Sequence, residues 1–288
     1  MMHAPIYLLA IDHRWQWEAW CDANGVSRER IFDIKRLALD AFLDARTRSV
    51  DVQASGALLV DLTYGAEAFA AARSAGITVG TPAEKAGAFP LEWAGAFDRA
   101  LPGDFVKVLV RHGSDTAAGV VAQQRQQLLE VQAWCAAAGK PLVLEVLVAP
   151  GQGDDTASFD AVVRPQLISS YIRDAYAAAL VPHFWKVEGM PDRRAFATVD
   201  AAVREVAGAG QLILGKGAGM GLVRQWFASA SGMPTAAGFA IGRTVYQAPA
   251  AEWIIGRCTR AEAVNRIADN YLSLIGAWRG SAGAAAPR

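Results

Sequence analysis

The stretch IYLLAIDHRWQW, residues 6–17, decides between two fold classes. Its first residues are apolar and β-rich, and the run ends at Asp12, which predicts a short buried strand over residues 6–11. An open doubly wound sheet that binds a dinucleotide has a glycine-rich turn directly after its first strand. No glycine occurs in residues 12–17. The stretch therefore argues against the open sheet, which stays the second alternative.

Similar runs recur along the chain, and each is followed by a longer segment with helical spacing. The predicted strands are residues 6–11, 57–61, 77–80, 105–110, 142–148, 184–188, 212–215 and 238–242. Strands that alternate with helices form a parallel sheet, and eight such units in about 250 residues match a closed (β/α)8 TIM barrel of the α/β class. The third unit is the weakest, because Pro90 interrupts residues 81–100 and predicts a loop with a short helix there.

No low-complexity linker divides the chain, so we expect one catalytic barrel domain over residues 1–279. Residues 280–288 are small and without periodicity, which predicts a disordered tail. Trp253 and Trp278 fit either a helix interface in a homo-oligomer or ordinary core packing. The sequence leaves both open.

Composition limits the classes of partner. The 288 residues include 28 basic and 28 acidic side chains, and this balance predicts no attraction to nucleic acid or to an anionic membrane surface. The first apolar run is too short for a signal peptide, and no later run approaches the roughly 20 apolar residues of a membrane helix. Three widely spaced cysteines fit a reducing compartment. The sequence predicts a cytoplasmic protein.

Charged residues occur inside or directly after the predicted strands. Lys107, Glu145 and Lys186 lie within the fourth, fifth and sixth strands, and Asp12 and Arg14 follow the first. An unpaired charge in an apolar interior costs several kcal/mol, whereas active sites of TIM barrels lie at the C-terminal strand ends. Either these charges compensate one another as structural ion pairs, or they form a site.

A mechanism that proceeds through an imine would explain why these charged residues lie inside the barrel. A lysine with apolar neighbours and a second cation nearby has a lowered pKa, and its neutral amine attacks a carbonyl to form a Schiff base. Lys186 has apolar sequence neighbours, and Lys107 lies two strands away. Glu145, on the strand between them, is the predicted acid/base group. Glu188 is a second candidate for that role, with a rim ion pair to Arg193 or Arg194 as its alternative.

Glycines and cations follow the last two predicted strands. In TIM barrels the phosphate of a substrate is often bound by these two loops and by a helix N-terminus. We therefore predict a phosphate site and a phosphorylated small-molecule substrate. The predicted phosphate-binding residues are Gly215, Lys216, Gly217, Gly242 and Arg243.

Metal-dependent and aromatic alternatives are weaker. His13 and His112 follow strands, but the four histidines form no H-x-x-x-H spacing, so we predict no metal and no other cofactor; a divalent-metal aldolase stays an alternative. The aromatic stretch 15–20 resembles a substrate wall. It lacks the surrounding basic residues of a nucleic-acid stacking surface.

Several motifs together resemble a known family. They are LLAIDHRWQWE (8–18), VKVLV (106–110), LEVLV (144–148), FWKVEG (184–189), LGKGA (214–218) and GFAIGRTVYQAP (238–249). Over about residues 5–275 the chain resembles the domain C-terminal to the sugar kinase in bacterial inositol-catabolism proteins, a 5-dehydro-2-deoxyphosphogluconate aldolase. It is more distantly similar to the class I tagatose-bisphosphate and sulfofructose-phosphate aldolases, which are (β/α)8 barrels.

The resemblance implies a class I, metal-independent aldolase. Its expected reaction is cleavage of 5-dehydro-2-deoxygluconate 6-phosphate to dihydroxyacetone phosphate and malonate semialdehyde. Lys186 would form the imine, with Glu145, Lys107 and Asp12 as the other catalytic residues and Arg14 binding substrate oxygens. A non-catalytic barrel that binds a phosphosugar is the second hypothesis.

Overall fold

The computed structural model describes residues 5–95, 101–113, 115–151 and 158–284. Eight parallel strands close into one barrel, in which the order around the barrel follows the chain and β8 pairs with β1. The predicted (β/α)8 TIM barrel is confirmed. The strands are β1 (Ile6–Ala10), β2 (Gly56–Leu59), β3 (Thr78–Pro82), β4 (Val106–His112), β5 (Leu142–Val148), β6 (Phe184–Glu188), β7 (Gly210–Leu214) and β8 (Ala236–Ile241).

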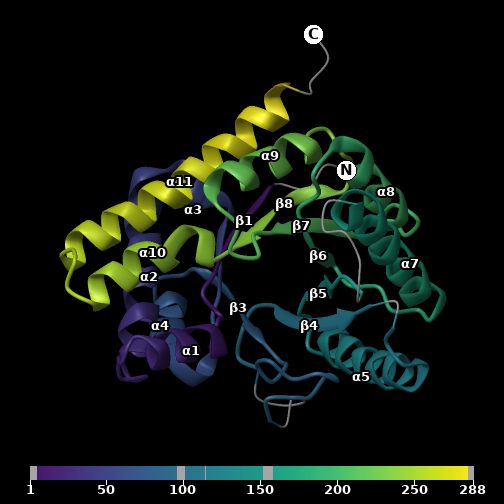
Figure 1. Cartoon of the computed structure of the whole chain (residues 1–288), viewed down its shortest axis with the longest axis horizontal. Coiled ribbons are helices and arrows are strands. Elements are labelled where there is room, and N and C mark those ends of the chain that lie inside the picture. The colour runs from purple at the N-terminus through teal and green to yellow at the C-terminus, as the bar shows by residue number, and fades with distance from the viewer. Residues whose placement is uncertain (1–4, 96–100, 114, 152–157, 285–288) are drawn as a thin grey trace.

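Helices surround the strands, as Figure 1 shows. A π-helical turn, Phe159–Val163, leads directly into α7. The helices are α1 (Trp15–Ala23), α2 (Arg30–Arg48), α3 (Val50–Ser55), α4 (Leu62–Ser74), α5 (Ala118–Ala137), α7 (Arg164–Ala177), α8 (Arg193–Val203), α9 (Met220–Ala230), α10 (Arg243–Ile254) and α11 (Arg260–Ala284).

Alternate strand residues face the inside of the barrel, and this interior changes character along its axis. At the N-terminal strand ends it is apolar, with Ala57 and Val143 in one small cluster. Toward the C-terminal ends the inward positions carry Lys107, Glu145 and Lys186, all buried. The outward positions are apolar and pack against the helices in the main core. Charge is therefore concentrated at the end of the barrel where TIM-barrel active sites lie.

The third βα unit departs from the pattern. Residues 83–95 contain no helix, and Glu84 instead forms an isolated antiparallel bridge with Trp93. The expected short helix is therefore absent from this described part of the connection, and residues 96–100 lie outside the described residues. The first residues of this connection, 84–88, line the cavity at the C-terminal strand ends.

The C-terminal helix is longer than expected. α11 continues through residues 280–284, which were predicted to be a disordered tail, and residues 285–288 lie outside the described residues. Ile267, Tyr271 and Leu274 recur at helical spacing and are buried. The Tyr271 hydroxyl donates a hydrogen bond to the Tyr7 carbonyl of β1, at 2.5 Å. Trp278 is also buried, against Phe227 of α9.

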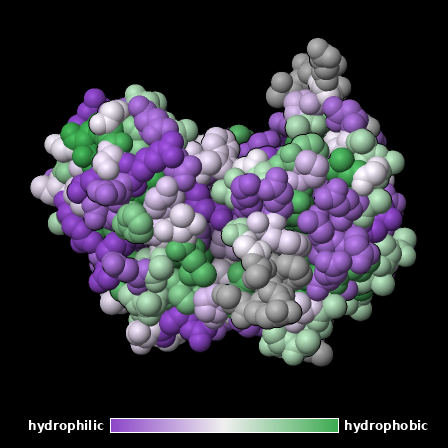
Figure 2. Space-filling view, turned by 90° about the horizontal axis from the view of Figure 1, so that it is seen from below, coloured by the Kyte–Doolittle hydropathy of each residue, from purple (hydrophilic) through white to green (hydrophobic). Residues whose placement is uncertain are grey.

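The surface is mixed. Figure 2 shows a face on which hydrophilic residues predominate and hydrophobic residues are scattered in small groups. Among the described residues, no helix combines the length and the apolar character that crossing a membrane requires.

Candidate active site

A cavity of about 360 Å³ opens at the C-terminal strand ends. Inward side chains of β4, β5 and β6 form one wall, and the segments that follow β1, β3, β7 and β8 form the rest. Every predicted catalytic and substrate-binding residue lines it. These residues are Asp12, Arg14, Lys107, Glu145, Lys186, Gly215, Lys216, Gly217, Gly242 and Arg243.

Lys186 and Glu145 occupy directly opposed positions of β6 and β5. Lys186 Nζ donates a hydrogen bond of 2.9 Å to Glu145 Oε2, and both side chains are about 95% buried. Parallel pairing in this register puts both side chains on the inner face, where they meet. Glu145 therefore lies within hydrogen-bond distance of the amine, where a proton-transfer partner of Lys186 would have to be.

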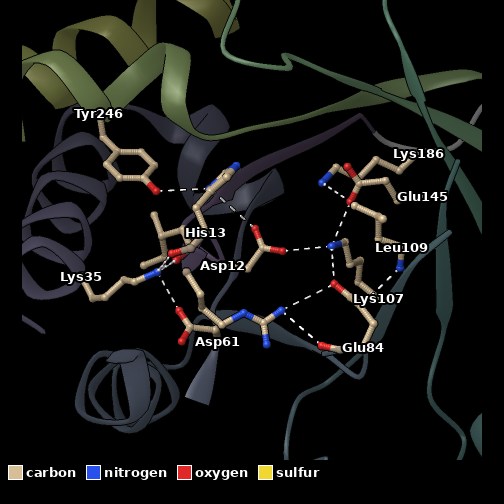
Figure 3. Close-up of polar contacts among 12 residues, drawn as sticks. Asp12, His13, Lys35, Asp61, Glu84, Lys107, Leu109, Glu145, Lys186 and Tyr246 are labelled. Atoms are coloured by element: carbon tan, nitrogen blue, oxygen red, sulfur yellow. Dashed lines mark hydrogen bonds and ion pairs between the residues drawn. The ribbon is translucent and has the colours of Figure 1, made fainter. Parts of the chain in front are cut away.

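Lys107 lies at the centre of a carboxylate cluster, as Figure 3 shows. Its Nζ is 3.1 Å from Asp12 Oδ2, 2.8 Å from Glu84 Oε1 and 2.9 Å from Glu145 Oε2. Burial alone would lower the pKa of Lys107, but the charges of Asp12, Glu145 and Glu84 outweigh burial and raise it well above its usual value. Lys107 is therefore a fixed cation. Lys107 and Lys186 share one oxygen of Glu145, which brings the two ammonium groups close together although their strands are not adjacent.

Two carboxylates of this cluster, Asp12 and Glu145, are held ionised. Burial raises the pKa of Asp12 and of Glu145, but the nearby cations Lys107 and Lys186 outweigh it and lower both values. Arg14 also belongs to the cluster, because its Nη2 donates to the Glu84 carbonyl at 3.2 Å. Its Nε is buried without a hydrogen-bond partner among the described residues.

Glu84 is a site residue that sequence reasoning missed. It follows β3 directly, in the unit whose prediction was weakest, and it is 5% exposed. One carboxylate oxygen binds Lys107, and the other accepts a hydrogen bond from the Leu109 amide at 3.2 Å. The available signal was its position: an acid directly after a strand of the barrel.

His13 belongs to a chain of hydrogen bonds that fixes its protonation. Trp17 Nε1, which can only donate, bonds to the Tyr246 hydroxyl at 3.1 Å. The hydroxyl oxygen lies 3.2 Å from His13 Nδ1, and the direction of this hydrogen bond depends on the tautomer of the ring. If the hydroxyl donates to Nδ1, His13 carries its proton on Nε2. Burial lowers the pKa of His13 to about 3, with the opposing charge of Asp12 too weak to restore it.

Lys35 and Asp61 form a second buried pair, outside the cavity lining. Lys35 Nζ lies 2.6 Å from Asp61 Oδ2 and donates to the carbonyls of Ile11 and His13. Burial lowers the pKa of Lys35, and the charge of Asp61 partly offsets this. The lysine of α2 thus holds the backbone on both sides of Asp12. Its place on the apolar face of α2, four residues after Ile31, was the sequence signal.

The predicted phosphate-binding loops lie together. A Cβ added to Gly217 would be 3.3 Å from the Arg243 guanidinium carbon, so the two loops touch there. A Cβ on Gly242 would overlap the Ala10 carbonyl, which makes this glycine necessary for close approach to β1. Arg243 Nε and Thr244 Oγ1, at the start of α10, are buried without hydrogen-bond partners among the described residues. Thr244 was not predicted.

Glu188 is placed differently from both sequence interpretations. It is fully buried, ion-pairs with Arg164 of α7 and lies 2.8 Å from Lys216 Nζ. It does not line the cavity, whose described lining includes Lys186 of the same strand. The expected pairing with Arg193 or Arg194 is wrong, because Arg193 donates to the Ser231 carbonyl. Glu188 instead anchors Lys216 at the mouth.

The histidines of the metal-dependent alternative do not converge. His112 packs against Tyr171, with 5.0 Å between ring centroids, and burial lowers its pKa. His13 lies across the barrel, against Tyr246. Among the described residues, no group of three histidine, cysteine, aspartate or glutamate side chains is arranged to hold a metal ion.

Comparison with known proteins places the chain in a family. The solved structure of fructose-bisphosphate aldolase from Plasmodium falciparum, in complex with TRAP and a small-molecule inhibitor, superposes with a TM-score of 0.70 at 13% identity, covering 100% of this chain and 93% of that one. At this identity the similarity establishes the fold. No curated protein matches the sequence. The family model described as "Uncharacterized protein conserved in bacteria (DUF2090)" matches residues 2–282, and the chain belongs to this family.

Proposed function

We propose that the protein is a class I, metal-independent aldolase that cleaves a phosphorylated keto sugar acid or ketose through a Schiff base on Lys186. The observation that carries the proposal is the contact between Lys186 and Glu145 inside the cavity, at 2.9 Å. A buried amine beside one carboxylate, with an anion site on the neighbouring strands, is what imine chemistry on a phosphorylated ketone requires.

The reaction begins at the amine of Lys186. Glu145 accepts a proton from the ammonium form of Lys186, and the neutral amine then attacks the substrate ketone to give a carbinolamine. Glu145 returns a proton to the departing hydroxyl, so that water leaves and the imine forms.

Cleavage follows from the imine. A β-hydroxyl group loses its proton, the C–C bond breaks, its electron pair moves toward the imine nitrogen, and an aldehyde departs. Protonation of the resulting enamine and addition of water release the ketone and restore Lys186. These proton transfers take place beside Glu145.

The other charged residues hold the substrate. Asp12 is kept ionised and can accept hydrogen bonds from substrate hydroxyl groups, while Lys107, a fixed cation, orients an oxygen and keeps Glu145 in place. Arg14 binds further substrate oxygens. Gly215, Lys216, Gly217, Gly242 and Arg243 would bind the phosphate, and the partnerless Arg243 Nε and Thr244 Oγ1 support an anion there.

The sequence resemblance supports one substrate in particular. This is 5-dehydro-2-deoxygluconate 6-phosphate, cleaved to dihydroxyacetone phosphate and malonate semialdehyde. Tagatose bisphosphate and sulfofructose phosphate are the alternatives, and an assay with the three compounds ranks them by kcat/KM.

Borohydride trapping tests the mechanism. The protein is incubated with dihydroxyacetone phosphate, reduced with borohydride and mapped by peptide mass. We expect a reduced adduct on Lys186, none in Lys186→Met, and an unchanged yield in the control Lys140→Met, whose lysine lies after α5 and bonds the Leu101 carbonyl. Absence of the adduct, with turnover abolished by EDTA, would establish the metal-dependent alternative instead.

A barrel that binds a phosphosugar without cleaving it is the second candidate. It predicts a ligand-dependent rise in melting temperature that survives Lys186→Met, with no product from the wild-type protein.

A further inference from the structure

The cavity is strongly cationic, and its cations lie in two groups. Its described lining contains seven lysine and arginine side chains, Arg14, Lys85, Lys107, Arg111, Lys186, Lys216 and Arg243, against the three carboxylates Asp12, Glu84 and Glu145. Lys107 and Lys186 are bound to those carboxylates. The phosphate loops account for Lys216 and Arg243. A second group consists of Arg111 and Lys85, which have no role in the proposed function, together with Arg14, whose Nη2 donates to the Glu84 carbonyl in the connection after β3.

The barrel places the two groups on opposite sides. In a closed barrel of eight strands in chain order, β4 lies across from β8 and β3 from β7. Lys216 and Arg243 follow β7 and β8, whereas Arg111 is on β4 and Lys85 follows β3. A phosphate held by the first group cannot also occupy the second, because the reacting lysine lies on the wall between them.

Arg111 continues the inward row of β4 above Lys107. Lys107, Leu109 and Arg111 alternate along the strand, and all three line the cavity. At about 3.3 Å per residue, Arg111 lies roughly 13 Å nearer the mouth than Lys107 at the backbone. Its neighbour across β5 is Leu147, and that of Leu109 is Glu145. A pair of leucines therefore separates the acid/base group from the arginine.

Contacts at the rim of the cavity connect Arg111 with Trp15 and Arg14. Arg111 Nη1 donates to the Gly87 carbonyl at 3.1 Å. Gly87 has φ +78°, and a Cβ there would be 3.5 Å from Trp15. Trp15 adjoins Arg14, whose buried Nε has no hydrogen-bond partner within the described part of the chain. Arg111, Trp15 and Arg14 are thus joined by one loop at the cavity edge.

We propose that Arg111 and Arg14 bind a carboxylate on the aldehyde half of the substrate. A guanidinium group matches the two oxygens of a carboxylate, and the leucine pair below Arg111 suits a short methylene spacer between that carboxylate and the reacting carbon. Among the residues described as lining the cavity, this end contributes one glycine, Gly87, whereas the phosphate loops contribute three. The inference rests on the proposed aldolase function and deepens it.

The same arrangement agrees with the polarity of the proposed cleavage. Lys186 is on β6, directly beside β7, which leads into Lys216, and two strands away from β4, which carries Arg111. The phosphate stays with the imine, and the carboxylate leaves with the aldehyde. The opposite polarity would place a carboxylated ketone, such as pyruvate, on Lys186.

Condensation reactions test the carboxylate site. With dihydroxyacetone phosphate as donor, kcat/KM is measured for malonate semialdehyde, for neutral propanal and for glyceraldehyde 3-phosphate. Losing a charge-assisted hydrogen bond corresponds to about 10- to 100-fold. We expect Arg111→Gln to lower the ratio of malonate semialdehyde to propanal by that factor, Arg111→Lys to lower it less, and the exposed control Arg36→Gln to leave it unchanged.

Two results would overturn the proposal. One is an unchanged ratio in Arg111→Gln; the other is a preference of the wild-type protein for glyceraldehyde 3-phosphate, which would make the site a second phosphate site. The polarity is tested by borohydride trapping. An adduct of pyruvate but not of dihydroxyacetone phosphate refutes the polarity and keeps the Schiff-base function, whereas an adduct with neither compound refutes the aldolase itself.

Discussion

Lys186 Nζ lies 2.9 Å from Glu145 Oε2, across directly paired positions of β6 and β5. The amine has this carboxylate as its hydrogen-bond acceptor, and the same oxygen also lies 2.9 Å from Lys107. In the proposed reaction, a proton leaving Lys186 goes to a carboxylate that Lys107 already orients. The proposal therefore makes Glu145 the group on which the proton transfers depend.

Replacing Glu145 by glutamine removes the proton acceptor and keeps the shape. We expect kcat to fall by about 10²- to 10⁴-fold, the usual contribution of a positioned acid/base group, with a much smaller change in KM. Steady-state kinetics measures both. Glu130→Gln, an exposed change on α5, is the matched control. A kcat within threefold of the wild-type value would transfer the role to another group.

Replacing Lys107 by methionine removes the cation shared by three buried carboxylates. We expect the free energy of unfolding at pH 7 to fall by about 3–5 kcal/mol, because buried charges then lose their partner. Urea denaturation measures the loss. The control Lys85→Met, which breaks the exposed ion pair of Lys85 with Glu92, should lose less than about 1 kcal/mol.

The pH dependence of the free energy of unfolding distinguishes an electrostatic effect of Lys107→Met from a packing defect. In the wild-type protein the pKa values of Asp12 and Glu145 are lowered. The stability that these ionised carboxylates contribute is therefore complete above about pH 4.5 and is lost as pH falls below it. In Lys107→Met the deficit should shrink over the same range, because protonated carboxyl groups no longer repel. A deficit independent of pH would indicate a packing defect.

The sequence predicted the barrel and the strand-borne charges for the same reason. The alternation of inward and outward positions along each strand, together with the strand order, places Lys107, Glu145 and Lys186 on one inner surface without knowledge of any side-chain rotamer. The same alternation of side chains along β6 predicted that Glu188 also faces the site. This prediction failed, because Arg164 and Lys216 hold Glu188 outside the cavity lining.

Residues outside regular strands were not predictable in this way. Glu84 lies in a connection that lacks a regular pattern, and its contact with Lys107 depends on the path of that loop. Lys35 and Asp61 come from a helix and a loop that meet only in the folded protein. The His13 tautomer depends on Tyr246, more than 200 residues away in the chain.

Because His13 is neutral in the folded protein, stability also depends on pH above the range in which the carboxylates titrate. The unfolded chain takes up a proton near the ordinary pKa of about 6.5, whereas the folded protein does so only at about 3, so the unfolded state binds more protons between these values. Stability is complete above about pH 6.5 and is lost as pH falls toward 3. Between pH 7 and 5 the wild-type protein should lose about 2 kcal/mol more than His13→Gln, by urea denaturation at both pH values.

The tautomer of His13 is measurable directly. Nitrogen-15 NMR of the histidine ring should show the proton on Nε2 in the wild-type protein. Tyr246→Phe removes the hydroxyl that donates to Nδ1 and should shift the ring toward a mixture of tautomers, while His183, which faces the Leu142 amide, serves as the internal reference. A proton on Nδ1 in the wild-type protein would reverse the direction of the hydrogen-bond chain.

The Lys35–Asp61 pair should act on the site through the backbone. Lys35→Met leaves Asp61 buried and unpaired, and we expect a loss of about 3–5 kcal/mol in the free energy of unfolding. Asp61→Asn keeps the acceptor for the Tyr64 amide that begins α4. In the double variant the losses should be less than additive by about 1–3 kcal/mol, because neither charge remains. Lys35→Arg, which keeps the charge, should restore stability more than kcat, because Lys35 also fixes the carbonyls on both sides of Asp12 and a longer side chain displaces them. Equal recovery of both quantities would limit the pair to a structural role.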